Sequence, residues 1–269
     1  WDSLAEASDQ PVAEMMDTWT KQTGFPLLDV EIRQEGRMIE VNSVQRRFLY
    51  THLLEDQELD PTIWHIPLTA RSSDPTSTTV QLVKKSQKTV KFNLPSKSVG
   101  RTWIKINPGH TGFYRTRYTA PEMKQLLPAI TNLELPPADR LGIQSDAFAL
   151  CRAGYIQAAE YLKIVEAYVN ETDESVWAEL SLSLSVLDNL LADGPAYARF
   201  QGLGRRLYRP IVRKIGWDKR SEEGHTDALL RSIVLGQLGS FGDPNILQQA
   251  SLRFAQYAND PTTIHPDLR

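Results

Sequence analysis

The sequence predicts a β-sandwich followed by an α-helical solenoid, with one helix in front of them. Three observations predict this fold class. Residues 25–118 contain short runs that alternate apolar and polar side chains, the period of a half-buried strand. Residues 119–269 repeat apolar side chains at the period of a helix face, and residues 1–24 do the same before a helix-ending glycine. The expected domains are therefore 1–24, 25–118 and 119–269.

The first zone carries an apolar stripe at helical spacing. Ser3 and Glu6 have the spacing of a capping box, which favours a helix start at this point. Gly24 ends the predicted helix, and Pro26 prevents its continuation. The stripe consists of Val12, Met15, Met16 and Trp19.

The second zone contains strand signals at short, regular intervals. Strands are predicted over 28–33, 38–41, 64–70, 79–84, 89–94, 101–106 and 113–118. Glu35-Gly36-Arg37 separates the first two and predicts a hairpin. Strands at this spacing are typical of a compact β-sandwich. The polar, acidic segment 51–60 is predicted to be a mobile loop.

The third zone shows apolar stripes over 158–169, 176–191 and 197–215, each with helical period. Asp243-Pro244 combines a good N-cap with proline at the first helical position. The helix that follows is expected to point Ile246, Ala250, Phe254 and Tyr257 inward. Successive helices joined by short turns predict a HEAT/armadillo-like solenoid of stacked helical hairpins.

Composition excludes several classes of function. The chain has 269 residues with a formal net charge of −3, so it offers neither a basic footprint for nucleic acid nor a polybasic membrane patch. No apolar run approaches the roughly 18 residues of a membrane span. Cys151 is the single cysteine, which excludes an internal disulfide and a thiolate zinc site. We therefore expect a reducing, cytoplasmic setting.

The histidines do not form a zinc motif. The H-E-x-x-H motif places two histidine ligands on one helix face, with glutamate as general base. No two histidines of this chain are four residues apart, so the motif is absent. We therefore expect no catalytic, cofactor-binding or metal-binding residue in this chain. The histidines are His52, His65, His110, His225 and His265.

His225 has the most acidic surroundings, with Glu222, Glu223 and Asp227 nearby. A metal ligand or a general base is one interpretation of this group. A polar loop, in which one side chain caps a helix starting near Thr226, is favoured because no second ligand lies at a defined offset.

Four other features have structural interpretations. His110 lies in a tight glycine turn that lacks the Lys-Ser/Thr of a phosphate loop. Cys151 has no evident histidine partner and is predicted to be a buried structural residue. Gly202 and Gly204 lie inside a helical stripe, unlike a nucleotide fingerprint. The basic residues of 205–214 are expected on a solvated face, with an acidic partner as the alternative.

Four segments, taken in order, resemble the puromycin-sensitive branch of the gluzincin zinc aminopeptidases. They are WTKQTGFP at 19–26, NPGHTGFYRTRY at 107–118, the opening of a helical domain at 135–150, and GWD with GHTDALLR within 216–231. The second is similar to the signature that closes the family's β-sandwich. Phe113 and Arg117 depart from it, because tyrosine and a small polar residue are common there.

The resemblance implies a role for each zone. It implies that 1–24 is the last helix of a thermolysin-like catalytic domain, 25–118 a β-sandwich spacer, and 119–269 the first part of a helical bowl over the substrate cavity. The family's zinc ligands and general base have no counterpart here, so zinc belongs to the parent enzyme. The implied partners are peptide substrates and the missing catalytic domain, with neither nucleic acid nor membrane.

The resemblance therefore implies a non-catalytic fragment of a cytosolic aminopeptidase. The alternatives are a naturally truncated module that binds peptides or proteins, and an enzyme with a new site around His225. An orphaned first helix would expose its stripe of Val12, Met15, Met16 and Trp19. Self-association or a poorly ordered N-terminus is expected from such exposure.

Overall fold

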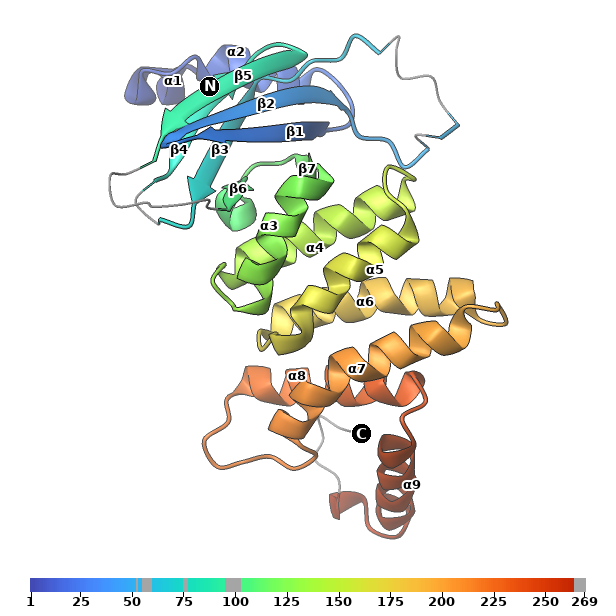
Figure 1. The fold of residues 1–269 in the computed structure, drawn as a ribbon. Helices are drawn as coiled ribbons and strands as arrows, with labels where there is room; N and C mark the ends of the chain where they lie inside the picture. The colour runs from blue at the N-terminus through green and yellow to red at the C-terminus, as the bar shows by residue number, and fades with distance from the viewer. Residues whose placement is uncertain (52, 55–59, 75–76, 95–102, 264–269) are drawn as a thin grey trace. The chain divides into compact units, whose positions relative to one another are not determined.

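The computed structural model describes residues 1–51, 53–54, 60–74, 77–94 and 103–263 (Figure 1). The chain divides into two compact units. The first unit comprises 1–130 and 134–161, and the second comprises 131–133 and 162–269. The described part of the first unit contains two β-sheets and several helices, and the described part of the second is helical. The three-zone division expected from the sequence stays a prediction.

The strands of the first unit form a four-stranded sheet of order β5-β2-β1-β7 and a three-stranded sheet of order β4-β3-β6. β1 pairs with β7 in parallel, and the other pairs are antiparallel. Each predicted strand overlaps one of these, although residues 101–102 and most of the predicted loop 51–60 lie outside the described residues. The strands are β1 (Pro26–Glu35), β2 (Met38–Arg47), β3 (Ile66–Ser72), β4 (Thr79–Val83), β5 (Gln87–Asn93), β6 (Ile104–Ile106) and β7 (Arg115–Tyr118).

Alternating side chains of these strands build the core of the first unit. Every second residue of β2 is buried from Ile39 to Gln45, as the period of a strand requires. β3 alternates in the same way, and Ile66 and Leu68 are fully buried. The predicted hairpin is confirmed, because only Gly36 and Arg37 separate β1 from β2. Gly36 adopts φ 60°, a conformation that glycine enters without steric cost.

The N-terminal segment forms two helices, α1 (Asp2–Ser8) and α2 (Val12–Thr20), where the sequence predicted one. The left-handed Asp9 (φ 51°) and Pro11 interrupt the backbone between them. The predicted capping box is also wrong, because α1 begins at Asp2 and no side chain caps it.

The expected exposure of the apolar stripe on α2 is wrong as well. Val12, Met15, Met16 and Trp19 are all half-buried. Side chains of β3 and β4 line a groove together with Val12 and Met15, so the sheet covers part of the stripe.

Helices α3 (Ala120–Thr131) and α4 (Pro137–Arg152) follow β7, and α5 (Ala158–Glu166) spans the division between the units. α4 contacts β7 and the short 3-10 helix η1 (Pro108–His110). It is unusual in burying charged and amide side chains along its length: Asp139, Arg140, Gln144 and Asp146. This helix therefore brings polar groups into the interior of the first unit.

In the second unit, α6 contacts α7 and α8, α7 contacts α8, and α8 contacts α9. Most members of the predicted helical stripes are buried, among them Val165, Leu180, Leu184 and Leu207. Leu191, Tyr197 and Leu203 are half-buried. The elements are η2 (Ala167–Asn170), α6 (Glu174–Leu191), α7 (Tyr197–Ile215), α8 (His225–Ser240), α9 (Pro244–Asn259) and η3 (Pro261–Thr263).

The predicted start of α9 is confirmed, because the Asp243 side chain accepts hydrogen bonds from the backbone of Asn245 and Ile246. Its predicted inward face is wrong in part. Ile246 is buried, but Ala250 and Phe254 are exposed. Among the described elements α9 contacts chiefly α8 and η3, so the later turns of its apolar face lie in solvent.

Candidate functional site

The described histidines are not gathered into a metal site. His65, His110 and His225 lie in the described ranges, and His52 and His265 lie outside them. Within those ranges, no group of three or more histidine, cysteine, aspartate or glutamate side chains could hold a metal ion. The expectation that this chain supplies no catalytic, cofactor-binding or metal-binding residue stays a prediction.

The acidic residues around His225 serve the start of α8. The backbone N–H of Gly224, the N-cap, donates to Asp227 Oδ2 at 2.9 Å. Glu223 accepts a hydrogen bond from the buried Arg231, which holds the pKa of Glu223 below its usual value. Both carboxylates thus stabilise local structure, as the loop interpretation predicted.

Two of the basic residues expected on the solvated face of α7, Arg205 and Arg209, instead have partners within the fold. Arg205 Nη1 donates to Phe241 O at 2.6 Å, and Arg209 Nε donates to Asp243 Oδ2 at 2.8 Å. They hold the turn between α8 and α9. Gly204 is buried beneath this turn, where an added Cβ would lie 2.5 Å from the Phe241 ring. The residues that do occupy a solvated face are Arg206, Arg213 and Lys214.

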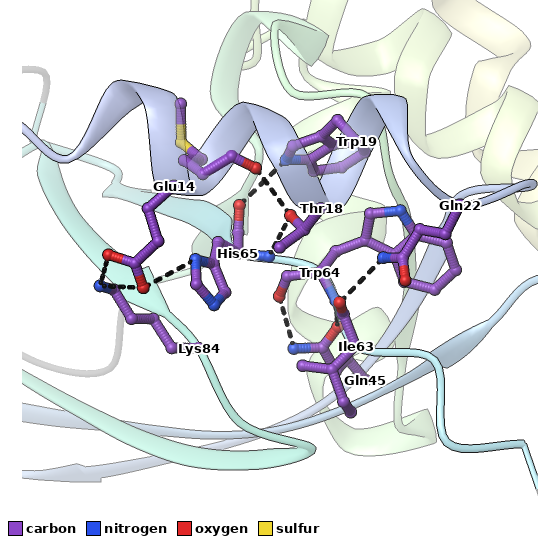
Figure 2. Close-up of polar contacts among 10 residues, drawn as sticks. Glu14, Thr18, Trp19, Gln22, Gln45, Ile63, Trp64, His65 and Lys84 are labelled. Carbon is purple, nitrogen blue, oxygen red and sulfur yellow. Dashed lines mark hydrogen bonds and ion pairs between the residues drawn. The ribbon is translucent and has the colours of Figure 1, made fainter. Parts of the chain in front are cut away.

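Helix α2 is anchored to the segment that precedes β3 (Figure 2). The Trp19 indole N–H donates to His65 O at 3.1 Å, and the His65 backbone N–H donates to Thr18 Oγ1 at 3.0 Å. Gln22 Nε2 donates to Ile63 O at 2.9 Å. Two hydrogen bonds of α2 and a third from Gln22, just after the helix, therefore join this segment to main-chain atoms of residues 63–65.

The same segment is held from its other side by Gln45 of β2 (Figure 2). Gln45 Oε1 accepts from Trp64 N at 2.9 Å, and its Nε2 donates to Trp64 O at 2.9 Å. The Trp64 and Trp19 rings lie 6.3 Å apart. Residues 63–65 thus connect α2 to the four-stranded sheet through side chains that are largely removed from water.

A charged cluster, defined as Arg71, Lys105, Arg115, Asp139 and Asp146, lies where α4 meets η1 and β7. Asp139 accepts from Arg71 and from the backbone N–H of Gly109 at 2.6 Å. Asp146 accepts from Arg115 Nη1 at 3.1 Å and from the backbone N–H of Thr116 at 3.0 Å. The two carboxylates are two helical turns apart, so both project from one face of α4.

Lys105 of β6 is 1% exposed, and its ammonium donates to the carbonyl oxygens of Ile106 and Asn107. Burial lowers its pKa, and the charges of Asp139 and Asp146 oppose that effect. Burial raises the pKa of Asp146, against the opposing charge of Arg115. Burial thus disfavours the charged forms of both Lys105 and Asp146, while Arg71 and Arg115 each pair with one of the two carboxylates.

The turn over 107–112 is fixed by its own side chains. Asn107 is left-handed (φ 57°), and its side-chain amide exchanges two hydrogen bonds with the backbone of Gly112, at 2.7 and 2.9 Å. The His110 ring lies so close to Gly142 of α4 that an added Cβ would be 2.2 Å from Nδ1. Burial lowers the pKa of His110. The structural interpretation of this turn is confirmed.

Cys151 lies near the end of α4 and is half-buried, so the expected full burial is only partly met. Burial raises the pKa of its thiol, which disfavours the reactive thiolate.

A pocket of about 380 Å³ opens beside the turn. We call it the turn pocket, and its lining includes Phe25, Tyr50, His110, Phe113, Arg115 and Ser145. Aromatic rings form much of its wall, and Arg115 connects it to the charged cluster. The sequence interpretation missed it, because its lining comes from separate segments of the first unit.

None of the helices in the described ranges is long and apolar enough to cross a membrane.

Comparison with known proteins identifies the family. The model of the ERAP1-like C-terminal domain family matches residues 103–269. Aminopeptidase M1-A of Oryza sativa subsp. japonica is 31% identical over 100% of this chain and 30% of its own length. Puromycin-sensitive aminopeptidase of Caenorhabditis elegans is 30% identical over 100% of this chain and 28% of its own length.

Glutamyl aminopeptidase of Sus scrofa is 31% identical over 100% of this chain and 28% of its own length. The chain thus spans about 30% of the length of the curated relatives that it matches. The order of the four motif segments had predicted this relationship. The chain belongs to the ERAP1-like C-terminal domain family and is related along its whole length to the puromycin-sensitive and glutamyl aminopeptidases.

Proposed function

We propose that this chain is the non-catalytic portion of a zinc aminopeptidase that removes N-terminal amino acids from peptides. The observation that carries the proposal is the match of the whole chain to proteins named aminopeptidases, although its sequence contains no H-E-x-x-H motif. A separate catalytic domain would hold the zinc, which activates water for attack on the first peptide bond.

In this proposal the two sheets of 25–118 form a β-sandwich spacer between other domains. The helices of 119–269 form the first part of a solenoid that covers the substrate cavity. The buried faces of β2 and β3 and the successive contacts of α6, α7, α8 and α9 support these assignments. A cytoplasmic setting without nucleic-acid or membrane partners accords with the single cysteine and the net charge of −3.

Residues 1–24 would then be the last part of the catalytic domain. The three hydrogen bonds between residues 18–22 and residues 63–65 support this role, because they would hold a domain attached to α2 in a fixed relation to the sheets. Trp19 is central to the attachment, since its ring packs on Trp64 while its N–H donates to His65.

A chimera tests the proposal. This chain would replace the aligned region of the Caenorhabditis elegans puromycin-sensitive aminopeptidase, and hydrolysis of aminoacyl amides and of peptides of increasing length would be measured. We expect zinc-dependent aminopeptidase activity from the chimera. We also expect its dependence on peptide length to differ from that of the parent enzyme, because the proposed cover of the cavity has changed.

The isolated chain provides the control. Its rate of aminoacyl-amide hydrolysis and its metal content should be determined on one sample. We expect no turnover and no stoichiometric zinc. Zinc-dependent turnover that survives purification would overturn the non-catalytic assignment and would make His225 the first residue to mutate.

A further inference from the structure

The turn pocket has an accessible aromatic wall. Phe113 is 71% exposed and Tyr50 is 51% exposed, although both are large apolar side chains. The Phe113 ring lies 5.2 Å from that of Phe25, which stacks in turn on Phe48 at 5.3 Å. Exposed aromatic rings that gather around a concavity are typical of a binding site. The wall therefore offers a continuous apolar surface to a ligand.

Arg115 supplies the polar end of the pocket. Its Nη1 donates to Ser145 Oγ at 2.9 Å and to Asp146 Oδ1 at 3.1 Å. Its Nε and Nη2 make no hydrogen bond with any residue in the described ranges. A guanidinium carries five N–H donors in a planar fork that matches a carboxylate. The side of the fork not used by Asp146 is therefore suited to a second carboxylate.

The charged cluster behind Arg115 favours a negative ligand. Its permanent cations are Arg71 and Arg115, which pair with Asp139 and Asp146, and the amine of Lys105 lies behind them. Buried charges are stable when they are paired. One negative charge can pair with the open side of the Arg115 guanidinium, whereas a second would face Asp146. The complement of this pocket is thus a monoanion.

His110 adds a polar but uncharged wall. Desolvation lowers its pKa, and the nearby positive charges of Lys105 and Arg115 act in the same direction, whereas Asp146 and Asp139 oppose it. The neutral imidazole leaves Arg115 as the cationic side chain that lines the pocket. The volume of about 380 Å³ is that of a small-ligand site, large enough for one aromatic acid.

We propose that the turn pocket binds a monocarboxylate that bears an aromatic or large aliphatic group. The carboxylate lies on the open side of the Arg115 guanidinium, and the apolar group packs against Phe25 and Phe113. A free organic acid and the C-terminal residue of a peptide share this chemistry. The site belongs to the first unit and does not depend on the proposed peptidase function.

Titration of the whole chain with matched acid and amide probes tests the proposal. Binding of 3-phenylpropionate and 3-phenylpropionamide would be followed by calorimetry and by NMR shifts of the His110 ring protons. We expect the acid to bind about tenfold or more tightly than the amide, because the amide loses the charge-assisted pair. Equal affinities, or no binding at millimolar concentration, would overturn the proposal.

Peptide probes then distinguish the two sources of the ligand. A tetrapeptide ending in phenylalanine would be compared with its C-terminal amide and with 3-phenylpropionate. Tighter binding of the peptide acid than of the small acid identifies a peptide C-terminus as the ligand. Tighter binding of the small acid identifies a free organic acid. Either result supports the proposed site only if the C-terminal peptide amide again binds more weakly than the peptide acid.

Two exposed phenylalanines provide a matched pair of variants. Phe113→Ala removes the wall of the pocket, and we expect about tenfold weaker binding of the acid. Phe254→Ala removes an equally exposed ring (69%) from α9, and binding should not change. Arg115→Lys keeps a positive charge beside Asp146 but loses the planar fork, so discrimination between acid and amide should fall. Equal losses of acid affinity in Phe113→Ala and Phe254→Ala would contradict the assignment of the binding site to the turn pocket.

Discussion

The two units of this chain stabilise their buried charges by different means. In the first unit the partners are distant in sequence, with 68 residues between Arg71 and Asp139. In the second unit, Glu223 and Arg231 are eight residues apart, and Asp243 caps the helix that it precedes. The second unit also has a pair between distant residues, because Arg209 donates to Asp243 from 34 positions away, but the Arg209 side chain is 43% exposed. The first unit therefore gathers several buried charges into one cluster, whereas the second uses single pairs beside helices that pack through apolar side chains.

The difference predicts unequal costs when one partner is removed. Removing a carboxylate from the charged cluster leaves buried cations unmatched, which is more costly than losing a helix cap. Three substitutions of charged residues test this contrast, with Asp17→Ala as a control, and a pair of glycine substitutions tests the apolar packing of the second unit. They are given from the largest expected effect to the smallest.

Asp139→Ala should lower the free energy of unfolding the most. It removes the partner of Arg71 and of the Gly109 N–H and leaves Lys105 with less opposing charge. We expect a loss of about 3–5 kcal/mol in the free energy of unfolding, measured by urea titration with tryptophan fluorescence. Asp17→Ala is the control, because Asp17 pairs with Lys21 on the exposed side of α2 and should contribute less than about 1 kcal/mol. Similar losses of unfolding free energy in the Asp139→Ala and Asp17→Ala variants would contradict the buried ion pairing of Asp139.

Substitution of two helical glycines by alanine tests the packing in the second unit. Gly204→Ala should destabilise the unit by about 1–3 kcal/mol, because the new methyl group would collide with the buried ring of Phe241. Gly236→Ala, on α8 with no atom within 4 Å of its added Cβ, should stabilise by up to about 1 kcal/mol. Thermal unfolding of the two variants should shift in opposite directions. A shift of the same sign would contradict the packing at Gly204.

Asp243→Ala tests the local cap. Burial opposes ionisation of Asp243, but the hydrogen bonds from Arg209 and Ile246 outweigh it and lower the pKa. A carboxylate with a lowered pKa stabilises the fold above its unfolded pKa, and this stability is lost as pH falls through the folded pKa. We expect a cost of about 1–2 kcal/mol at pH 7 that disappears in acid, measured by unfolding over a pH series. A cost independent of pH would contradict the lowered pKa of Asp243.

Lys105→Met should have the smallest effect near neutral pH, and its sign depends on pH. Burial lowers the pKa of Lys105, so the unfolded state binds its proton more tightly between the folded pKa and 10.5. The stability of the parent chain should therefore rise with pH in that window relative to the variant, by less than about 1.4 kcal/mol per pH unit. Denaturant titrations at two pH values measure this slope. A slope of opposite sign would show that the ammonium is favoured by its site.

The apolar periods of the sequence predicted the helices and strands well, because each period depends on neighbouring residues alone. Alternation located each strand, and Asp243-Pro244 located the start of α9. Pro11 was present in the sequence but was outweighed by the apolar stripe, so the break between α1 and α2 was missed.

The sequence could not predict in the same way which helix faces are buried or which charged residues gather into a cluster. Phe254 has the spacing of a core residue, yet burial depends on which elements lie opposite, and few described elements contact α9. In the sequence, Lys105 of β6 and Asp139 of α4 each resemble ordinary surface residues, and only the folded unit shows that both are buried. The turn pocket was missed for the same reason, because Phe25 and Arg115 are distant in sequence.

The contact between Gly142 and His110 links the evolutionary history of two positions. Any side chain at 142 would occupy the volume that the imidazole now fills. A lineage could therefore enlarge residue 142 only after residue 110 had become smaller, and the intermediate protein would contain a cavity at this contact. Substitutions at these two sites should appear in pairs and in that order.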